Sequence, residues 1–363
     1  MNLLSTESLR DDEQSVLSKI SGKSFVVRAK SIGLERASLG DIRAHFRAHA
    51  DRIKRQVREQ GVLLFRGLPV SQPEEYEQIL ESLDYDLYRS NYGGASPRSN
   101  VTGKTFVSTE APSPFIIGVH TEFCYQTTRP GMISFFCVTP AAGFGETPLF
   151  DLHGLWNDLG EPLRNKLQTD GLLYKRVFFG KKSLINFHKT WQDTFETRDK
   201  EVVRKFLEAE GMRYAWDASD NLSTELKLPA VLNDPLSGLP CISITTFNAD
   251  SFIHNFRHFK ERYHPVLRKM LEWFVTFEYN RKNSFLKVLH GCGRRFTREE
   301  SVEIQRAAWA NAIIFPWQTG DLLLIDNIRF GHARLNVRKP RRLIAAMADP
   351  YDVRSIMRAA PAH

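Results

Sequence analysis

The sequence predicts a mainly β domain, a sandwich or barrel, that carries helical insertions. Two observations support this fold class. Short apolar segments bounded by Gly and Pro gather early and late in the chain, as expected for the strands of one core. Between them, residues 160–215 and 254–290 show the spacing of apolar residues that is typical of helices. The chain has 363 residues, 42% hydrophobic and 25% charged, which are ordinary values for a globular protein.

Helices are expected where apolar residues recur every three or four positions. This spacing predicts one helix over 38–60, capped by Ser38 or Asp41. Thr297 and Glu300 have the spacing of a capping box and predict where another helix begins. The expected helices in chain order are 38–60, 73–83, 196–211, 254–290 and 297–312. One of them carries an aromatic series that we expect on its core-facing side: Trp273, Phe274, Phe277 and Tyr279.

Strands are expected in the apolar segments that end at turn residues. They are 62–70, 132–138, 147–152, 239–248, 321–328 and 342–348. We therefore expect a single domain over 1–363. Its β core covers approximately 60–152 and 239–350, and its helical insertion covers approximately 155–235 and 254–312.

Several classes of protein are excluded by composition. No run approaches the roughly 18 apolar residues of a membrane span, and the first residues lack the basic and apolar regions of a secretory signal. The four cysteines are scattered, with no Cys-x-x-Cys pair, which argues against a disulfide scaffold or structural zinc. We expect a cytoplasmic protein with reduced thiols.

The net charge of +8 permits an acidic partner. Nucleic acid, an anionic substrate and an acidic carrier protein are the candidates, and a solvated surface with surplus arginine is the alternative. The basic residues are dispersed and form no recognised nucleic-acid motif, so we expect no nucleic-acid partner.

The sharpest local pattern is His120-Thr121-Glu122. In an extended segment, residues i and i+2 point the same way, so an imidazole and a carboxylate project together. His332 follows an apolar strand and a Gly, and would complete the two-His-one-carboxylate set that binds iron(II) on one face. The alternatives are a surface His beside a solvated Glu, and a His at the end of a strand.

Four segments in order give the chain a wider resemblance. They are GVLLFRGLPV (61–70), FVSTEAP (106–112), the long segment 120–151 that begins HTEF, and 317–347, which contains FGHAR and PRRLIAAM. With these, the chain resembles the iron(II)/2-oxoglutarate dioxygenases of the TauD/TfdA-like superfamily. It looks closest to the SyrP-like, clavaminate-synthase-like branch.

The resemblance implies a fold, a cofactor and a set of site residues. The fold would be a double-stranded β-helix, or jelly roll, flanked by helices, and His120, Glu122 and His332 would hold Fe(II). The distal carboxylate of 2-oxoglutarate needs a cation, and arginine suits it. Arg341 and Arg342 both fall at the family's position, with a preference for Arg341. Thr147 matches the Gly-Glu-Thr position, where a hydroxyl also bonds that carboxylate.

The implied activity is hydroxylation of an aliphatic C–H bond. The substrate would be an amino acid or a small molecule derived from one, free or tethered to a peptidyl carrier domain, in natural-product biosynthesis. Dioxygen and 2-oxoglutarate are consumed, and succinate and CO2 are released. Arg334 is a candidate for binding a substrate carboxylate, with a structural salt bridge as its alternative. Desaturation, epoxidation or cyclisation by the same centre, and an inactive jelly-roll binding protein, remain open, as do the substrate and the oligomeric state.

Overall fold

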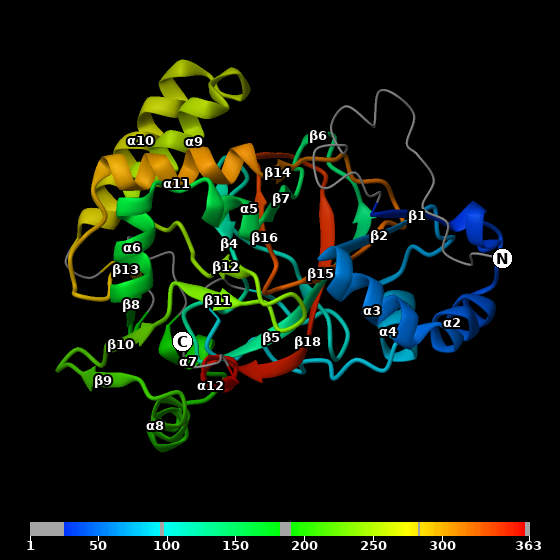
Figure 1. The fold of residues 1–363 in the computed structure, drawn as a ribbon, viewed down its shortest axis with the longest axis horizontal. Coiled ribbons are helices and arrows are strands. Elements are labelled where there is room, and N and C mark those ends of the chain that lie inside the picture. Colours follow the sequence, from blue (N-terminus) through cyan, green and yellow to red (C-terminus); the bar gives the residue numbers. More distant parts are fainter. Residues whose placement is uncertain (1–24, 95–97, 182–189, 282–283, 360–363) are drawn as a thin grey trace.

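The computed structural model describes residues 25–94, 98–181, 190–281 and 284–359 as a mixture of sheets and helices (Figure 1). The largest sheet has six strands, and only its β1–β2 pair is parallel. Its strands in spatial order are β1 (Val26–Arg28), β2 (Val62–Arg66), β15 (Leu322–Asp326), β5 (Thr128–Thr139), β18 (Arg342–Asp352) and β3 (Phe106–Val107).

A second, antiparallel sheet has four strands. In spatial order they are β14 (Ala312–Ile313), β7 (Leu149–Asp151), β16 (Phe330–Arg334) and β4 (Ile117–His120). The short turn 327–329 joins β15 of the first sheet to β16 of the second. In the described residues these strands belong to two separate sheets rather than to one closed barrel.

The two faces of the six-stranded sheet bury different cores. Along β15, Leu323 and Ile325 belong to the core that also contains residues of β4, β7 and β16, whereas Leu322 and Leu324 face the N-terminal helices. Successive strand residues point to opposite faces, and both faces are buried here, so this strand reads as a continuous apolar run. The expected strands 132–138, 321–328 and 342–348 are confirmed as β5, β15 and β18, with shifted ends, whereas only 62–66 of the strand expected over 62–70 form a strand, β2.

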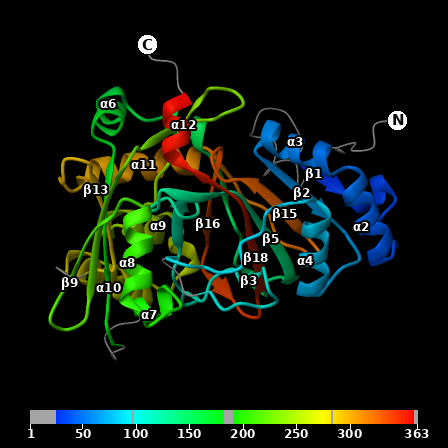
Figure 2. The same ribbon diagram turned by 90° about the horizontal axis from the view of Figure 1, so that it is seen from below.

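Three helices cover the outer face of the large sheet: α2 (Leu39–Ala48), α3 (Ala50–Gln60) and α4 (Pro73–Ser82). Figures 1 and 2 both place them at the end of the molecule beside β2 and β15. The prediction of one helix over 38–60 is wrong, because the chain leaves helical geometry at His49 (φ −115°, ψ 15°). Nδ1 of His49 donates to the carbonyl of His45 at 2.8 Å, so a side chain bonds one of the last carbonyls of α2. Ser38 caps α2, as expected.

The rest of the molecule combines helices with a further sheet. The helices are α5 (Leu152–Asn157), α6 (Glu161–Asp170), α7 (Trp191–Thr194), α8 (Lys200–Ala209), α9 (Ala249–His258), α10 (Pro265–Asn280), α11 (Arg298–Ala310) and α12 (Val353–Ala359). The sheet, in the order β13-β8-β10-β9, consists of β13 (Leu286–His290), β8 (Leu172–Phe178), β10 (Leu222–Leu228) and β9 (Arg213–Trp216). The prediction of a helical insertion over 155–235 did not include the strands β8, β9 and β10, of which β10 alternates between buried and more exposed residues.

Short elements complete the fold. Two small ladders pair β11 (Val231–Asn233) with β12 (Pro240–Ile242), and β6 (Gly143–Phe144) with β17 (Val337–Arg338). Two 3-10 turns are η1 (Ala29–Ile32) and η2 (Lys260–Arg262). The strand expected over 239–248 is shorter than predicted, since only 240–242 form a ladder strand. Within the described ranges, no helix combines the length and apolar character needed to cross a membrane.

The aromatic series of α10 divides between two environments. Phe274 and Tyr279 pack against the core formed with α9. Trp273 and Phe277 stack on each other instead, with 69% and 49% of their surface exposed. The prediction that all four face the core is therefore wrong for these two, because positions 273 and 277 share the solvent side of the helix.

The carboxyl group of Asp326, at the end of β15, should make folding stability depend on pH. Burial raises its pKa to about 6, and the charge of Asp234 adds to the rise. The folded protein therefore favours the protonated carboxyl group. The fold keeps its full stability from this group below pH 3.8, the pKa of the unfolded chain, and loses that contribution as pH rises through about 6. Asp326→Asn keeps an acceptor for the amides of Ile328 and Arg329. We expect it to raise the free energy of unfolding by about 1–3 kcal/mol at pH 8, and by much less at pH 4.

Urea unfolding of the wild type and the variant at both pH values measures this difference. Asp51→Asn is the control, since Asp51 is exposed on α3 and its loss should change stability by less than about 0.5 kcal/mol. A gain of the same size at pH 4 and pH 8 would contradict the assignment to Asp326.

Candidate functional site

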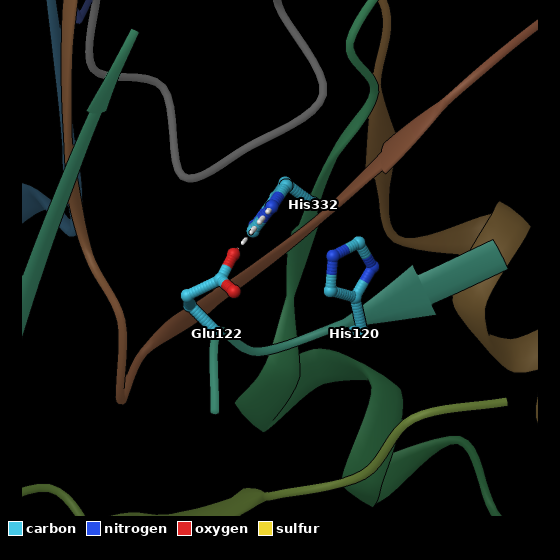
Figure 3. Close-up of side chains that lie close together, drawn as sticks. All are labelled: His120, Glu122 and His332. Carbon is cyan, nitrogen blue, oxygen red and sulfur yellow. Dashed lines mark ion pairs between the residues drawn. The ribbon is translucent and has the colours of Figure 1, made fainter. Parts of the chain in front are cut away.

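The two histidines of the sequence pattern lie side by side on adjacent strands. His332 of β16 pairs directly with His120 of β4 in the antiparallel ladder. Gly331, which precedes His332, allows this close approach, because a Cβ there would lie 3.2 Å from the carbonyl oxygen of His120 and 3.1 Å from Val119. The imidazole rings lie with their centroids 4.2 Å apart (Figure 3).

Glu122 follows β4 and is held by a buried asparagine. Oδ1 of Asn327 accepts from the Glu122 amide at 2.8 Å, and its Nδ2 donates to the carbonyls of Glu122 (3.0 Å) and Pro130 (2.8 Å). The next residue, Phe123, has a φ of +56° and is buried. A non-glycine residue in this conformation is strained, so the surrounding contacts must hold the turn in place.

The three side chains converge on one point (Figure 3). One ligand atom from each of His120, Glu122 and His332 lies within 4.8 Å of the others, and Glu122 Oε2 is 3.8 Å from His332 Nε2. Nδ1 of His120 donates to the Gly118 carbonyl at 2.9 Å, which leaves its Nε2 as an acceptor. Nδ1 of His332 is buried and has no hydrogen-bond partner among the described residues.

Burial favours the neutral form of both imidazoles. It lowers the pKa of His120, an effect that the charge of Glu122 partly offsets. It lowers the pKa of His332 well below the ordinary value, and the charges of His120 and Arg98 add to this effect. Neutral imidazoles and one carboxylate are the donors that a divalent first-row transition metal takes, with further positions left open for other ligands. The cluster therefore fits iron(II).

The cluster lines a pocket that encloses about 610 Å3, part of it open to solvent. Apolar and aromatic side chains make much of the wall, and Phe135 packs edge-on against His332 with centroids 5.1 Å apart. The polar and charged lining residues outside the cluster are Arg98, Ser108, Thr109, Thr121, Tyr125, Thr147, Thr245, Arg334 and Arg341.

Of the two candidate arginines, Arg341 lies in this pocket. Its Nε donates to the Gly145 carbonyl at 2.8 Å and its Nη2 to Thr147 Oγ1 at 3.2 Å. Trp317 Nε1 donates to the same hydroxyl at 3.0 Å, so Thr147 is fixed from two sides. Burial, together with the charge of Arg334, lowers the pKa of Arg341 to about 9, and a bound anion would relieve that cost. Arg342 is exposed at the start of β18 and does not line the pocket.

Arg334 lines the pocket but is committed to the backbone. Its Nη1 donates to the Ala111 carbonyl, and its Nη2 to those of Pro112 and Phe115, all at 2.8 Å. It therefore fastens the loop before β4 to β16. The expected contact between Arg334 and substrate stays a prediction.

Sequence reasoning missed Arg98. This residue lies in a loop rich in Ser, Gly and Asn, and its Nη2 donates to Glu122 Oε2 at 2.6 Å. No local motif marks it, because the contact joins residues 24 positions apart through loops with no regular spacing.

Comparison with known proteins defines the class and then the family. A model of the taurine catabolism dioxygenase TauD, TfdA family matches residues 24–347. The protein is a 2-oxoglutarate-dependent non-haem iron dioxygenase, with iron(II) as cofactor and 2-oxoglutarate and dioxygen as co-substrates. The chain belongs to the TauD, TfdA family, which confirms the resemblance seen in the sequence.

Individual relatives share less than a third of their aligned residues with this chain. The chain is 27% identical over 296 residues to a clavaminate synthase-like protein of Arabidopsis thaliana, covering 80% of this chain and 82% of the relative. It is 28% identical over 293 residues to the dapdiamide synthesis protein DdaC of Enterobacter agglomerans, covering 80% and 83%. Among solved structures, PvcB of Pseudomonas aeruginosa aligns over 82% of this chain and 79% of that chain, with 11% identity and a TM-score of 0.45.

Asn327 should be required for both folding and metal binding. Asn327→Ala removes the bonds to Glu122 and Pro130 and leaves a buried amide and two carbonyls without partners. We expect unfolding free energy to fall by about 2–4 kcal/mol. Affinity for Fe(II) should fall by about 10- to 100-fold, because the carboxylate loses its support. Denaturant unfolding and anaerobic Fe(II) titration measure the two effects.

Asn280→Ala, at the exposed end of α10, is the control and should leave both properties close to wild type. If Asn327→Ala bound Fe(II) as tightly as wild type while being destabilised, the expected link between the Asn327 side chain and metal binding at Glu122 would be disproved.

Proposed function

We propose that the enzyme hydroxylates an aliphatic C–H bond of an amino acid or of a small molecule derived from one, in natural-product biosynthesis. The observation that carries this proposal is one pocket that holds both a His-Glu-His cluster and a buried arginine–threonine pair. One relative is named for dapdiamide synthesis and the other for its likeness to clavaminate synthase, which supports a biosynthetic role. The substrate is a small molecule, free or carried on a peptidyl carrier domain.

Five residues of the pocket receive a role in this proposal. His120, Glu122 and His332 hold iron(II), and Thr147 and Arg341 bind the distal carboxylate of 2-oxoglutarate. When bound, iron(II) with 2-oxoglutarate and dioxygen supplies the oxidising power for the C–H bond and yields succinate and CO2 as co-products. The side chains of the pocket orient both organic molecules and limit water, which is the protein's share of such catalysis.

The fold is part of the same proposal. We infer that the six-stranded and four-stranded sheets form the double-stranded β-helix of a single catalytic domain. The support is that residues of both sheets share one core and that β15 continues directly into β16. Desaturation, epoxidation and cyclisation use the same ligand set, and identification of the oxidised product distinguishes them from hydroxylation.

The metal site is tested by anaerobic titration of the metal-free protein with Fe(II) and 2-oxoglutarate. We expect a weak visible charge-transfer band in the wild type and none in His120→Ala or His332→Ala. His254→Ala, a half-buried histidine on α9, is the control and should keep the band. A folded wild-type protein that binds iron without giving this band would refute the assignment, and an inactive binding protein would then be the better reading.

The two neighbouring arginines provide a matched pair for 2-oxoglutarate. Arg341→Gln removes the cation beside Thr147, and we expect the dissociation constant of 2-oxoglutarate to rise by about 10- to 100-fold. Arg342→Gln removes an exposed cation one residue away and should leave that constant unchanged. The measurement is the dependence of the charge-transfer band on 2-oxoglutarate concentration. Equal effects of the two variants would show that general charge, rather than this contact, matters.

A further inference from the structure

Arg98 is a buried cation, and not all of its N–H donors are hydrogen-bonded within the described residues. The residue is 9% exposed, and its Nη2 bonds Glu122 Oε2 at 2.6 Å. Its Nη1 is also buried but has no hydrogen-bond partner among the described residues. Leaving a charged donor unpaired inside a protein is costly. An arginine that served only to neutralise Glu122 would leave this cost uncompensated.

The charge of the pocket points the same way. Three guanidinium groups line it, those of Arg98, Arg334 and Arg341, against the single carboxylate of Glu122. A divalent iron and a dianionic 2-oxoglutarate cancel each other, so the occupied pocket keeps a surplus of positive charge. Buried charges are tolerated when they are paired, and a further anion is therefore expected in the pocket.

Only one of the three cations is left for that anion. Arg341 is beside Thr147, where the proposed function puts 2-oxoglutarate. The Nη atoms of Arg334 are taken by three backbone carbonyls. Arg98 is next to the metal-ligand cluster, on the Glu122 side, and its buried Nη1 has no hydrogen-bond partner among the described residues.

We propose that Arg98 binds a free carboxylate of the substrate, an inference that rests on the proposed function. A guanidinium offers two parallel N–H donors that match a carboxylate, which suits it to this task. The substrate class narrows accordingly to molecules that present an ionised carboxylate beside the iron ligands. An amino acid joined to a carrier through its only carboxyl group, as a thioester, would lack the group that Arg98 recognises.

The test compares acids with their uncharged counterparts. Two libraries are used as probes, the common L-amino acids and their α-carboxamides, each added anaerobically to the protein loaded with Fe(II) and 2-oxoglutarate. Perturbation of the charge-transfer band reports binding, and succinate release in air reports turnover. We expect at least one acid to bind the wild type about tenfold or more tightly than its amide.

Three variants locate the effect. Arg98→Gln should abolish the preference for acids and lower the affinity for the acid by about 10- to 100-fold. The charge-transfer band and its dependence on 2-oxoglutarate should stay as in the wild type. Arg98→Lys keeps the positive charge but lacks the two parallel N–H donors of a guanidinium, and it should retain part of the preference for acids. Arg89→Gln removes an exposed cation of the preceding loop and should behave as wild type.

The outcomes separate this inference from the proposed function. Absence of the band in the wild type defeats the proposed function, and with it the inference. A normal band with no acid preferred over its amide, or an undiminished preference in Arg98→Gln, overturns the inference alone. Weaker Fe(II) binding in Arg98→Gln with the acid preference intact also overturns it, since Arg98 would then only position Glu122. If Arg98→Gln does not fold, the wild-type comparison and Arg98→Lys still decide.

Discussion

The site depends on one buried amide. The side chain of Asn327 joins the turn between β15 and β16 to the backbone of Glu122 and to the Pro130 carbonyl. The strands on either side of that turn belong to different sheets, and the second of them carries His332 five residues later. The Asn327 side chain thereby fixes Glu122, on an irregular turn, relative to His332, on a regular strand. The ladder between β4 and β16 sets the position of His120 relative to the same His332.

This arrangement is unfavourable to the fold when no ligand is bound. The buried Nδ1 of His332 and Nη1 of Arg98 have no hydrogen-bond partner among the described residues, and burial depresses the pKa of Arg341. Most buried polar groups in folded proteins are hydrogen-bonded, so each of these exceptions calls for an explanation. Ligands that meet these groups bind only the folded chain, and so they stabilise it by mass action. The large apolar cores around both sheets support a pocket that is itself costly.

The sequence predicts those parts of the fold and of the site that depend on local patterns of residues. The apolar runs of β2, β5, β15 and β18 are read directly, and the Thr297–Glu300 capping box forms as expected. Alternation shows that only one of Arg341 and Arg342 can face the pocket, but it cannot say which, because the ladder changes register between Arg342 and Leu343. The break at His49 arises from a side chain bonding its own helix. Arg98 reaches Glu122 through tertiary contact alone, which no spacing in the chain encodes.

The pairing of Arg98 with Glu122 also couples the two ligands of the proposed site. Nη2 of the Arg98 guanidinium bonds the Glu122 carboxylate, and each of these groups is also one that a ligand would need. A metal ion that draws on the charge of Glu122 weakens this pair and makes Arg98 a stronger site for an anion. Linkage is reciprocal, so an anion on Arg98 must in turn favour the metal at Glu122 by the same factor. With the roles proposed here, metal and substrate would bind cooperatively through this one ion pair, and a substrate without a carboxylate would bind without that cooperation.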